Sequence, residues 1–205
     1  MRFRVFPSLA VAALCALAIW APGCASKPSS PPGEYQTVND APGRDAATAE
    51  QHHARATLLI EKGDWPGAEA ALKAALAADV MYGPAHNNLG KVYFHQGKLY
   101  LAAWEFQYAA KLMPNQPEPK NNLGLVFESA GKLDDAVTSY DEAMRIAPDN
   151  PQFIGNLARA RMRRGDRDDS VRELLSALVL RETRPDWVAW ARTRLAEMGR
   201  GDAGE

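Results

Sequence analysis

The chain has 205 residues, of which 46% are hydrophobic, and its formal net charge is −1 at pH 7. This composition predicts one folded unit with further residues at its ends. The near-neutral charge gives no general reason to expect nucleic-acid binding, which relies on basic side chains that neutralise phosphates. Both cysteines, Cys15 and Cys24, lie within the first 24 residues, so the rest of the chain contains no disulfide and no thiolate metal site.

Residues 1–23 have the pattern of a secretory signal peptide. Arg2 and Arg4 are the only charged side chains in this segment, and the stretch from Val5 to Ala21 is apolar except at Pro7 and Ser8. This stretch is short for a comfortable membrane span, and it is followed directly by Pro-Gly. The pattern therefore predicts export of the protein.

The end of this segment resembles the signal of a bacterial lipoprotein. Residues 21–24 read Ala-Pro-Gly-Cys, in which Gly and Cys agree with the family pattern and the first two residues depart from it. The resemblance implies cleavage before Cys24 and acylation of that residue, and several acyl chains anchor a protein durably. The next residues, Ala25 and Ser26, imply an outer-membrane lipoprotein that faces the periplasm. The alternatives are a soluble periplasmic or secreted protein and an uncleaved anchor.

Residues 24–48 are predicted to form a disordered tether. They contain few apolar residues, so they cannot bury enough surface to offset the entropy lost on ordering. The segment also contains four prolines, Pro28, Pro31, Pro32 and Pro42.

From residue 49 onward, residue types recur every 34 positions. A fixed period of this length predicts a stacked array of helical repeats, and such arrays use extended surfaces to bind partners. The recurring glycines are Gly63, Gly97, Gly131 and Gly165, and the recurring alanines are Ala75, Ala109, Ala143 and Ala177.

The period predicts four units of two helices each, joined at the recurring glycine, which suits a left-handed helix C-terminus. The units are residues 49–82, 83–116, 117–150 and 151–184. Helix A of each unit is expected at 49–62, 83–96, 117–130 and 151–164, and helix B at 65–78, 99–112, 133–146 and 167–181. A capping helix is expected at 185–198, followed by a flexible tail at 199–205.

The second and third units resemble the tetratricopeptide repeat. Both carry Asn-Leu-Gly in helix A, at 88–90 and 122–124, followed at the family spacing by an aromatic residue, glycine, alanine, a second aromatic residue, alanine and proline. In the outer units, Arg55 and Arg161 replace residues of the family pattern. The resemblance covers residues 49–184 and implies an all-α fold, an α-solenoid of about four repeats whose A helices form the inner, concave surface.

Small residues are expected where helix A crosses helix B of the same unit. Gly90 and Gly124 let helix A lie close to helix B, beside the alanine that recurs at 102 and 136. The large side chains Phe106 and Tyr140 then fill the space next to this contact. Added bulk at the crossing is predicted to overpack it.

A column of asparagines recurs on helix A, at Asn88, Asn122 and Asn156. An amide is both a donor and an acceptor, so a row of amides can pair with the backbone of an extended peptide whatever its sequence. The column resembles the asparagine ladder of some peptide-binding tetratricopeptide arrays. The alternative is that these amides simply bond to neighbouring backbone groups.

A second column, Asn87 and Asn121, ends at Gly155. Basic side chains beside it could select acidic or C-terminal carboxylate groups through charge-assisted hydrogen bonds, although a solvated face is the favoured interpretation. These side chains are Lys91, His95, Arg159 and Arg163, with Glu128 among them.

No catalytic or metal-binding set can be assembled from the sequence. The four histidines lack metal-ligand spacing, and no HExxH motif, nucleophile elbow or phosphate-binding glycine loop is present. Trp65 and Trp104, on B helices, are interpreted as packing residues in preference to a sugar platform. The arginine-rich stretch 159–172 is interpreted as solvated helix faces with local ion pairs. We therefore expect no cofactor and no metal.

These patterns predict a non-catalytic scaffold of the bacterial cell envelope that binds a peptide or protein segment in the concave groove. The family includes assembly factors for pilus, secretion and cell-wall complexes, and the sequence does not choose among them. One alternative is an accessory subunit that packs through its convex face within a larger complex. Another is a cell-wall-active enzyme. The partner and the oligomeric state stay open.

Overall fold

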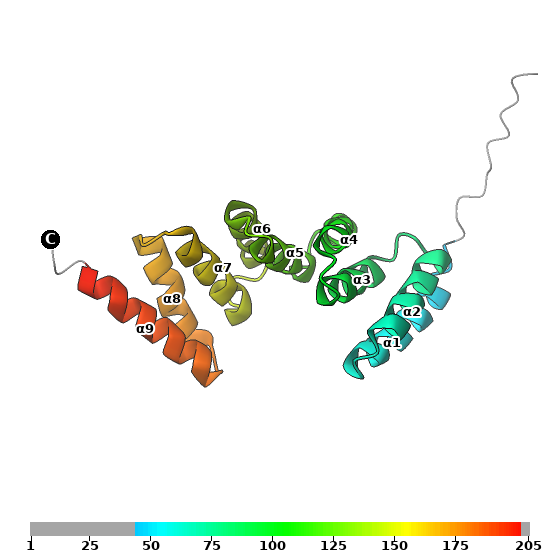
Figure 1. The fold of residues 1–205 in the computed structure, drawn as a ribbon, viewed down its shortest axis with the longest axis horizontal. Coiled ribbons are helices and arrows are strands. Elements are labelled where there is room, and N and C mark those ends of the chain that lie inside the picture. Colours follow the sequence, from blue (N-terminus) through cyan, green and yellow to red (C-terminus); the bar gives the residue numbers. More distant parts are fainter. Residues whose placement is uncertain (1–43, 202–205) are drawn as a thin grey trace, which may run out of the picture. The chain divides into compact units, whose positions relative to one another are not determined.

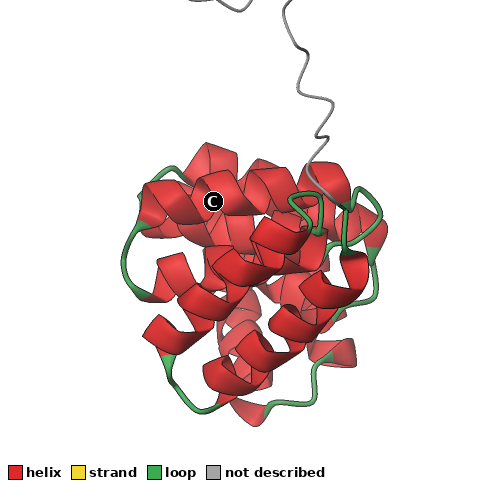
Figure 2. Ribbon diagram, turned by 90° about the vertical axis from the view of Figure 1, so that its right-hand side faces the viewer, coloured by secondary structure: helices red, strands yellow, loops and turns green. Residues whose placement is uncertain are grey.

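The computed structural model describes residues 44–201, and the regular structure in this range is helical (Figures 1 and 2). Its helices are α1 (Ala46–Glu61), α2 (Trp65–Ala78), α3 (Gly83–His95), α4 (Leu99–Leu112), α5 (Glu118–Ser129), α6 (Leu133–Ile146), α7 (Pro151–Arg164), α8 (Asp169–Arg181) and α9 (Pro185–Gly201). The predicted signal peptide, the lipidation site and all but the end of the tether lie outside the described residues. Within 44–201, no helix combines the length and apolarity needed to cross a membrane.

The helices pack in chain order as an array of antiparallel pairs. The odd-numbered helices α1, α3, α5 and α7 are the A helices, and each contacts the B helix that follows it. Each B helix in turn contacts the next A helix, and α9 packs on α8. In addition, α1 contacts α3 and α3 contacts α5, so successive A helices meet across the units. This arrangement confirms the predicted all-α repeat array.

The recurring glycines end the A helices as predicted. Their φ angles are +73°, +72°, +73° and +111° in the four units, a left-handed backbone conformation that other residues rarely adopt. In the first unit, Gly63 N donates to Ile60 O (3.0 Å) and Asp64 N donates to Leu59 O (2.9 Å). This pair of hydrogen bonds is a Schellman motif, which satisfies the last carbonyls of the helix and turns the chain into helix B.

The structure confirms that Gly90 and Gly124 lie at the crossing of helices A and B. The nearest neighbours of each glycine are atoms of the aromatic ring, whereas the sequence predicted the alanine at 102 or 136. A Cβ atom placed on Gly90 would lie 2.6 Å from the Phe106 ring, and one placed on Gly124 would lie 2.6 Å from the Tyr140 ring. Both aromatic side chains are almost completely buried. Each ring therefore lies directly on the backbone of helix A, which only a glycine at that position permits.

Three helix starts differ from the prediction. Helix α5 begins one residue late, at Glu118, and a capping aspartate accounts for the two larger differences. Helix α1 begins at Ala46, inside the predicted tether, because Asp45 accepts a hydrogen bond from Thr48 N (3.0 Å). Helix α8 begins at Asp169, two residues late, because Asp168 accepts one from Val171 N (3.1 Å). At the other end of the chain, α9 runs three residues past its predicted end, to Gly201.

The late start of α8 changes which of its residues are buried. In α6 the fully buried positions include Ala136 and Ala143, so the 34-residue period would bury Ser170 and Ala177 in α8. Ser170 is instead exposed, and the core takes Val171, one residue later. The fourth unit therefore keeps the period in its A helix and shifts it by one residue in its B helix.

The glycine contact gives a stability prediction. Gly124→Ala places a methyl group against the buried Tyr140 ring, so we expect a loss of about 1–3 kcal/mol in the free energy of unfolding. Gly199→Ala is the matched control, because Gly199 lies within α9 and has open space around its Cα. In urea unfolding, the control should equal or exceed the wild type by up to about 1 kcal/mol. Equal stabilities for the two variants would contradict this packing.

Candidate peptide-binding surface

The two asparagine columns interlock on the surface formed by the A helices, which we call the A-helix face. The side-chain amide of Asn122 donates to Asn87 Oδ1 (3.0 Å), and that of Asn156 donates to Asn121 Oδ1 (2.8 Å). Each bond joins residues 35 apart in the sequence and so links the A helices of neighbouring units. The columns form one ladder of hydrogen bonds that ties the units together.

The ladder divides the asparagines into buried and accessible members. Asn121 and Asn156 are 2% and 4% exposed, so their amides serve mainly the contact between units. Asn88 and Asn122 are only partly buried. Within the described residues, no hydrogen bond uses the Oδ1 atom of either one, so these two amides keep an acceptor for a ligand.

His53 completes the ladder at its N-terminal end. Asn88 Nδ2 lies 2.8 Å from His53 Nε2, which accepts the hydrogen bond when the ring is neutral and protonated on Nδ1. Burial, together with the nearby Lys91 charge, lowers the pKa of His53 and so favours this neutral form. A cavity of about 300 Å³ opens here. His53, Asn87 and Asn88 line it, together with Pro84, Met113, Gln116, Glu118 and Pro119.

The two basic side chains predicted in the second unit, Lys91 and His95, differ from each other in their surroundings. Lys91 is exposed, and partial desolvation of its ammonium group lowers its pKa despite the opposing effect of Glu118. His95 stacks on Trp65 of α2, with ring centroids 3.7 Å apart and planes 16° apart. Lys91 therefore lies near the His53–Asn88 pair, whereas one face of the His95 ring is covered by tryptophan.

Arg159 and Arg163 meet at a single buried carboxylate, that of Glu128. Arg159 Nε and Nη2 donate to its two oxygens at 3.0 and 2.8 Å, and Arg163 Nη1 donates at 2.9 Å. Tyr140 OH, from the glycine contact described above, donates to Glu128 Oε2 (2.8 Å). Burial alone would raise the pKa of Glu128, but the bonds from Arg159, Tyr140 and Arg163 lower it to about 2. Two guanidinium groups against one carboxylate leave this cluster with a net charge of +1.

Sequence reasoning missed the contribution of α9 to this surface. Trp187 lies against Gly155, where a Cβ atom would be only 2.6 Å from Cζ3 of the indole. The Arg159 guanidinium lies 5.4 Å from the Trp187 ring centroid. Trp187, Trp190, Arg159 and Asp186 line a cavity of about 190 Å³. The sequence signal for this contact was Gly155, which replaces asparagine in the column of Asn87 and Asn121. A glycine is needed there because the Trp187 ring occupies the space of a side chain.

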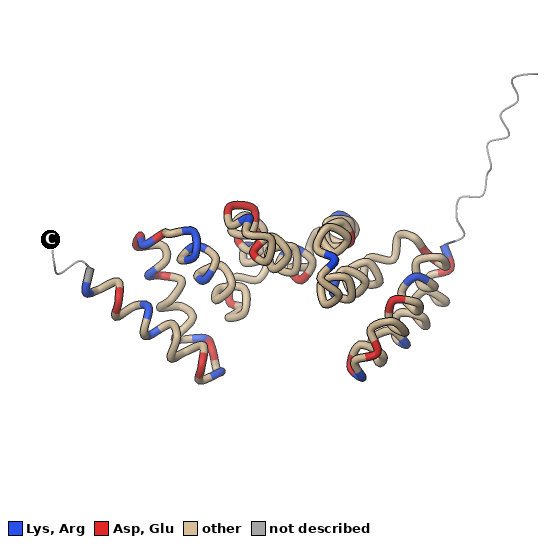
Figure 3. The backbone as a smooth tube through the Cα atoms, viewed as in Figure 1, with Lys and Arg blue, Asp and Glu red and all other residues tan. Residues whose placement is uncertain are grey.

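Of the remaining arginines in the stretch 159–172, two form ion pairs, as the sequence predicted. Arg164 pairs with Asp166 and with Asp134, and Arg172 pairs with Asp169. Arg161 instead donates to the Ser170 hydroxyl, and Arg167 donates to backbone carbonyl groups. Figure 3 shows basic and acidic residues alternating around the turn between α7 and α8. Residues 44–201 contain no group of three or more His, Cys, Asp or Glu side chains that could hold a metal ion.

The Glu128 cluster predicts a specific pH dependence. The pKa of Glu128 is about 2 in the folded state against an ordinary value of 4.5, so its stabilising effect is complete above about pH 5. The effect is lost as the pH falls through 2. The pKa difference between the unfolded and folded states corresponds to about 3 kcal/mol of stability. This value is an upper limit, because Arg163 is half-exposed and its charge is screened. Urea unfolding between pH 7 and pH 2 should therefore show a weaker dependence for Glu128→Gln than for the wild type.

The matched control is Glu142→Gln, since Glu142 is half-exposed and lies 3.9 Å from Lys120. Its stability should follow the wild-type pH dependence. Parallel curves for Glu128→Gln and the wild type would contradict the assigned role of Glu128.

Comparison with known proteins agrees with the helical-repeat fold. Two models of the tetratricopeptide repeat match residues 53–118 and 128–195, together more than half of the chain. YrrB, a tetratricopeptide protein with an unusual peptide-binding site, has 16% identity over 77% of this chain and 79% of its own, with a TM-score of 0.65. PilF of Pseudomonas aeruginosa has 20% identity over 78% of this chain and 79% of its own, with a TM-score of 0.64.

The first tetratricopeptide domain of Spaghetti, solved with the HSP90 peptide SRMEEVD, has 17% identity over 60% of this chain and 97% of its own, with a TM-score of 0.57. At such identities the likeness shows the fold alone. Among curated proteins, none matches the chain significantly. The family-model matches, the left-handed glycine turns and the glycine–aromatic crossings together show that the chain belongs to the tetratricopeptide repeat family.

Proposed function

We propose that this protein is a non-catalytic scaffold that holds an extended peptide or protein segment on the A-helix face. One observation carries the proposal. Asn88 and Asn122 are fixed by internal hydrogen bonds through Nδ2, while each keeps an unbonded Oδ1 on a partly buried side chain. Acceptors held in place in this way bind a peptide backbone without first losing side-chain entropy.

The charge on this face favours an acidic or C-terminal carboxylate at the α7 end. The Glu128 cluster carries a net positive charge, and the side chain of Arg163 is 52% exposed. The neighbouring cavity between Trp187 and Trp190 offers an apolar surface for the side chain beside that carboxylate. YrrB has a peptide-binding site, and the Spaghetti domain binds a peptide that ends in Glu-Glu-Val-Asp, so the fold supports this mode of binding.

The proposed place of action is the bacterial envelope. The support is the signal-like sequence of residues 1–23, followed by Cys24 in a lipoprotein-like context. Acylation of Cys24 would place the array at a membrane, on the periplasmic side of the outer membrane. An assembly role in a pilus, secretion or cell-wall complex belongs to this proposal, and its support is the likeness to PilF at the level of the fold.

Loss of the two accessible amides tests the binding surface. Peptides with free C-termini are selected from a random displayed library, and the enriched peptide is then synthesised. Each lost amide removes about 0.5–1.5 kcal/mol, so Asn88→Ala with Asn122→Ala should weaken binding by about tenfold or more in calorimetry. Asn115→Ala, at an exposed position in the turn after α4, is the matched control. Unchanged affinity in a double variant whose circular dichroism spectrum is still helical would contradict the proposal.

The anchor has a separate test. Cys24→Ala removes the only thiol available for acylation at the predicted cleavage site, so the protein should leave the membrane fraction in cells that export it. Fractionation and metabolic labelling with a fatty acid measure this directly. A Cys24→Ala protein that stays with the membrane, or a wild-type protein that incorporates no label, would contradict lipidation.

A further inference from the structure

Helix α4 exposes a stripe of aromatic side chains that packing does not explain. Tyr100 is 79% exposed and Trp104 is 60% exposed, and their spacing places them on one side of the helix. The packing role predicted for Trp104 is therefore wrong. Trp65 differs, since it is partly buried and stacks on His95.

The other units show that the fold does not require aromatic residues at these positions. One period later, in α6, the equivalent residues are Asp134 and Thr138, and both are exposed. One period earlier, the position of Trp104 is occupied by Ala70. Exposed tryptophan and tyrosine are typical of binding surfaces, where they supply large contact areas. The aromatic stripe is thus a feature of the second unit that the repeat itself does not demand.

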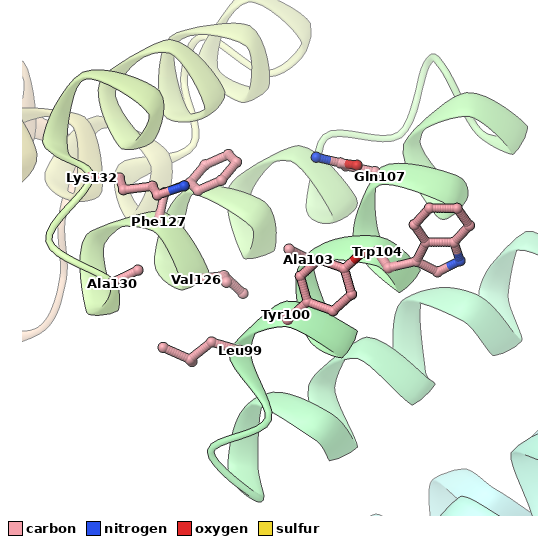
Figure 4. Close-up of a pocket in the computed structure, with 9 residues that line it drawn as sticks. All are labelled: Leu99, Tyr100, Ala103, Trp104, Gln107, Val126, Phe127, Ala130 and Lys132. Carbon is pink, nitrogen blue, oxygen red and sulfur yellow. The ribbon is translucent and has the colours of Figure 1, made fainter.

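These side chains border a cleft of about 470 Å³ between α4 and α5 (Figure 4). Tyr100, Ala103 and Val126 lie between the two helices, with Phe127 on the α5 side. The complete lining is Leu99, Tyr100, Ala103, Trp104, Gln107, Val126, Phe127, Ala130 and Lys132. None of these residues belongs to the asparagine ladder or to the Glu128 cluster, so the cleft shares no residue with either of them.

The charge in the lining of the cleft is positive. Lys132 is the one charged residue in its lining, and Lys111 lies at the far end of the same stripe of α4. In α6 the residue equivalent to Lys111 is Arg145, which pairs with Asp141. The position of that aspartate is taken by Gln107 in α4. Within the described residues, neither Lys111 nor Lys132 forms an ion pair.

We propose that this cleft is a second docking site, for an acidic peptide segment that carries an aromatic or large aliphatic side chain. The apolar side chain enters between Tyr100, Trp104 and Phe127. The carboxylates of the segment supply the partners that Lys111 and Lys132 lack inside the chain. The site goes beyond the A-helix face, and it gives the scaffold a way to hold two protein segments at once.

The test uses the full chain and a displayed library of random peptides. Peptides are selected on the wild type and counter-selected on the double variant Tyr100→Asp with Trp104→Thr, which we call the aromatic variant. This variant carries the residues that the third unit has at the equivalent positions, so it should fold. We expect the enriched peptides to combine Asp or Glu with an aromatic or large aliphatic residue. The absence of enrichment, or enrichment without acidic residues, would overturn the proposal.

An enriched peptide is then synthesised and its affinity measured by fluorescence anisotropy. Lys132→Glu should weaken binding at least tenfold, and added salt should weaken wild-type binding because the charges are solvent-exposed. Leu180→Asp is the control, since Leu180 is 82% exposed on α8 and should leave binding unchanged. Full affinity in Lys132→Glu or in the aromatic variant would overturn the proposal.

Two further outcomes would assign the cleft to another occupant. Dimerisation in analytical ultracentrifugation that the aromatic variant abolishes would identify a second copy of this chain. Binding of soluble cell-wall sugar fragments that the aromatic variant abolishes, with no peptide enriched, would identify a carbohydrate site. Either result would contradict docking of an acidic segment.

Discussion

Side-chain hydrogen bonds between successive A helices join the units and determine the chemistry of their shared face. Asn122 and Asn156 reach back to Asn87 and Asn121 of the preceding unit, and Asn88 reaches His53. A buried amide without a partner would cost about 1–3 kcal/mol, so this ladder forms as a complete set. The same bonds hold the remaining polar atoms of Asn88 and Asn122 in fixed positions. The residues that join the units are thus the same ones that we propose to bind a peptide.

At the C-terminal end of the array, a second interaction is added to the asparagine ladder. There the fourth A helix is joined to the third unit by arginine side chains on the buried Glu128 carboxylate, and the helix is covered by Trp187 of α9. Tyr140 connects the two systems, because its ring covers Gly124 while its hydroxyl bonds to Glu128. A single side chain therefore couples the packing inside the third unit to the electrostatics of the A-helix face.

The sequence was sufficient to predict those features that the 34-residue period repeats. The helix pairs, the left-handed turns and the glycine–aromatic crossings each follow from one residue type at one recurring position. The asparagine columns were also visible, but their internal bonding was not, because hydrogen bonds between residues 35 apart depend on how successive units stack.

Features that break the period could not be predicted in this way. The shift in α8 depends on whether Asp168 or an earlier residue caps the helix, a local competition that the repeat does not decide. The role of Trp187 depends on where α9 lies, beyond the last repeat. The predicted packing role of Trp104 was wrong. A position in the repeat indicates which side chains tend to be buried, but it does not indicate what an exposed side chain contacts.

The central claim is that the amides of the A-helix face contact a bound peptide directly. The most direct measurement is a ¹H–¹⁵N nuclear magnetic resonance titration that follows the asparagine side-chain NH₂ groups as a selected peptide is added. The account predicts that the signals of Asn88 and Asn122 shift, with those of Asn115 unchanged. Shifts confined to other parts of the array, with the Asn88 and Asn122 signals unmoved at saturation, would contradict it.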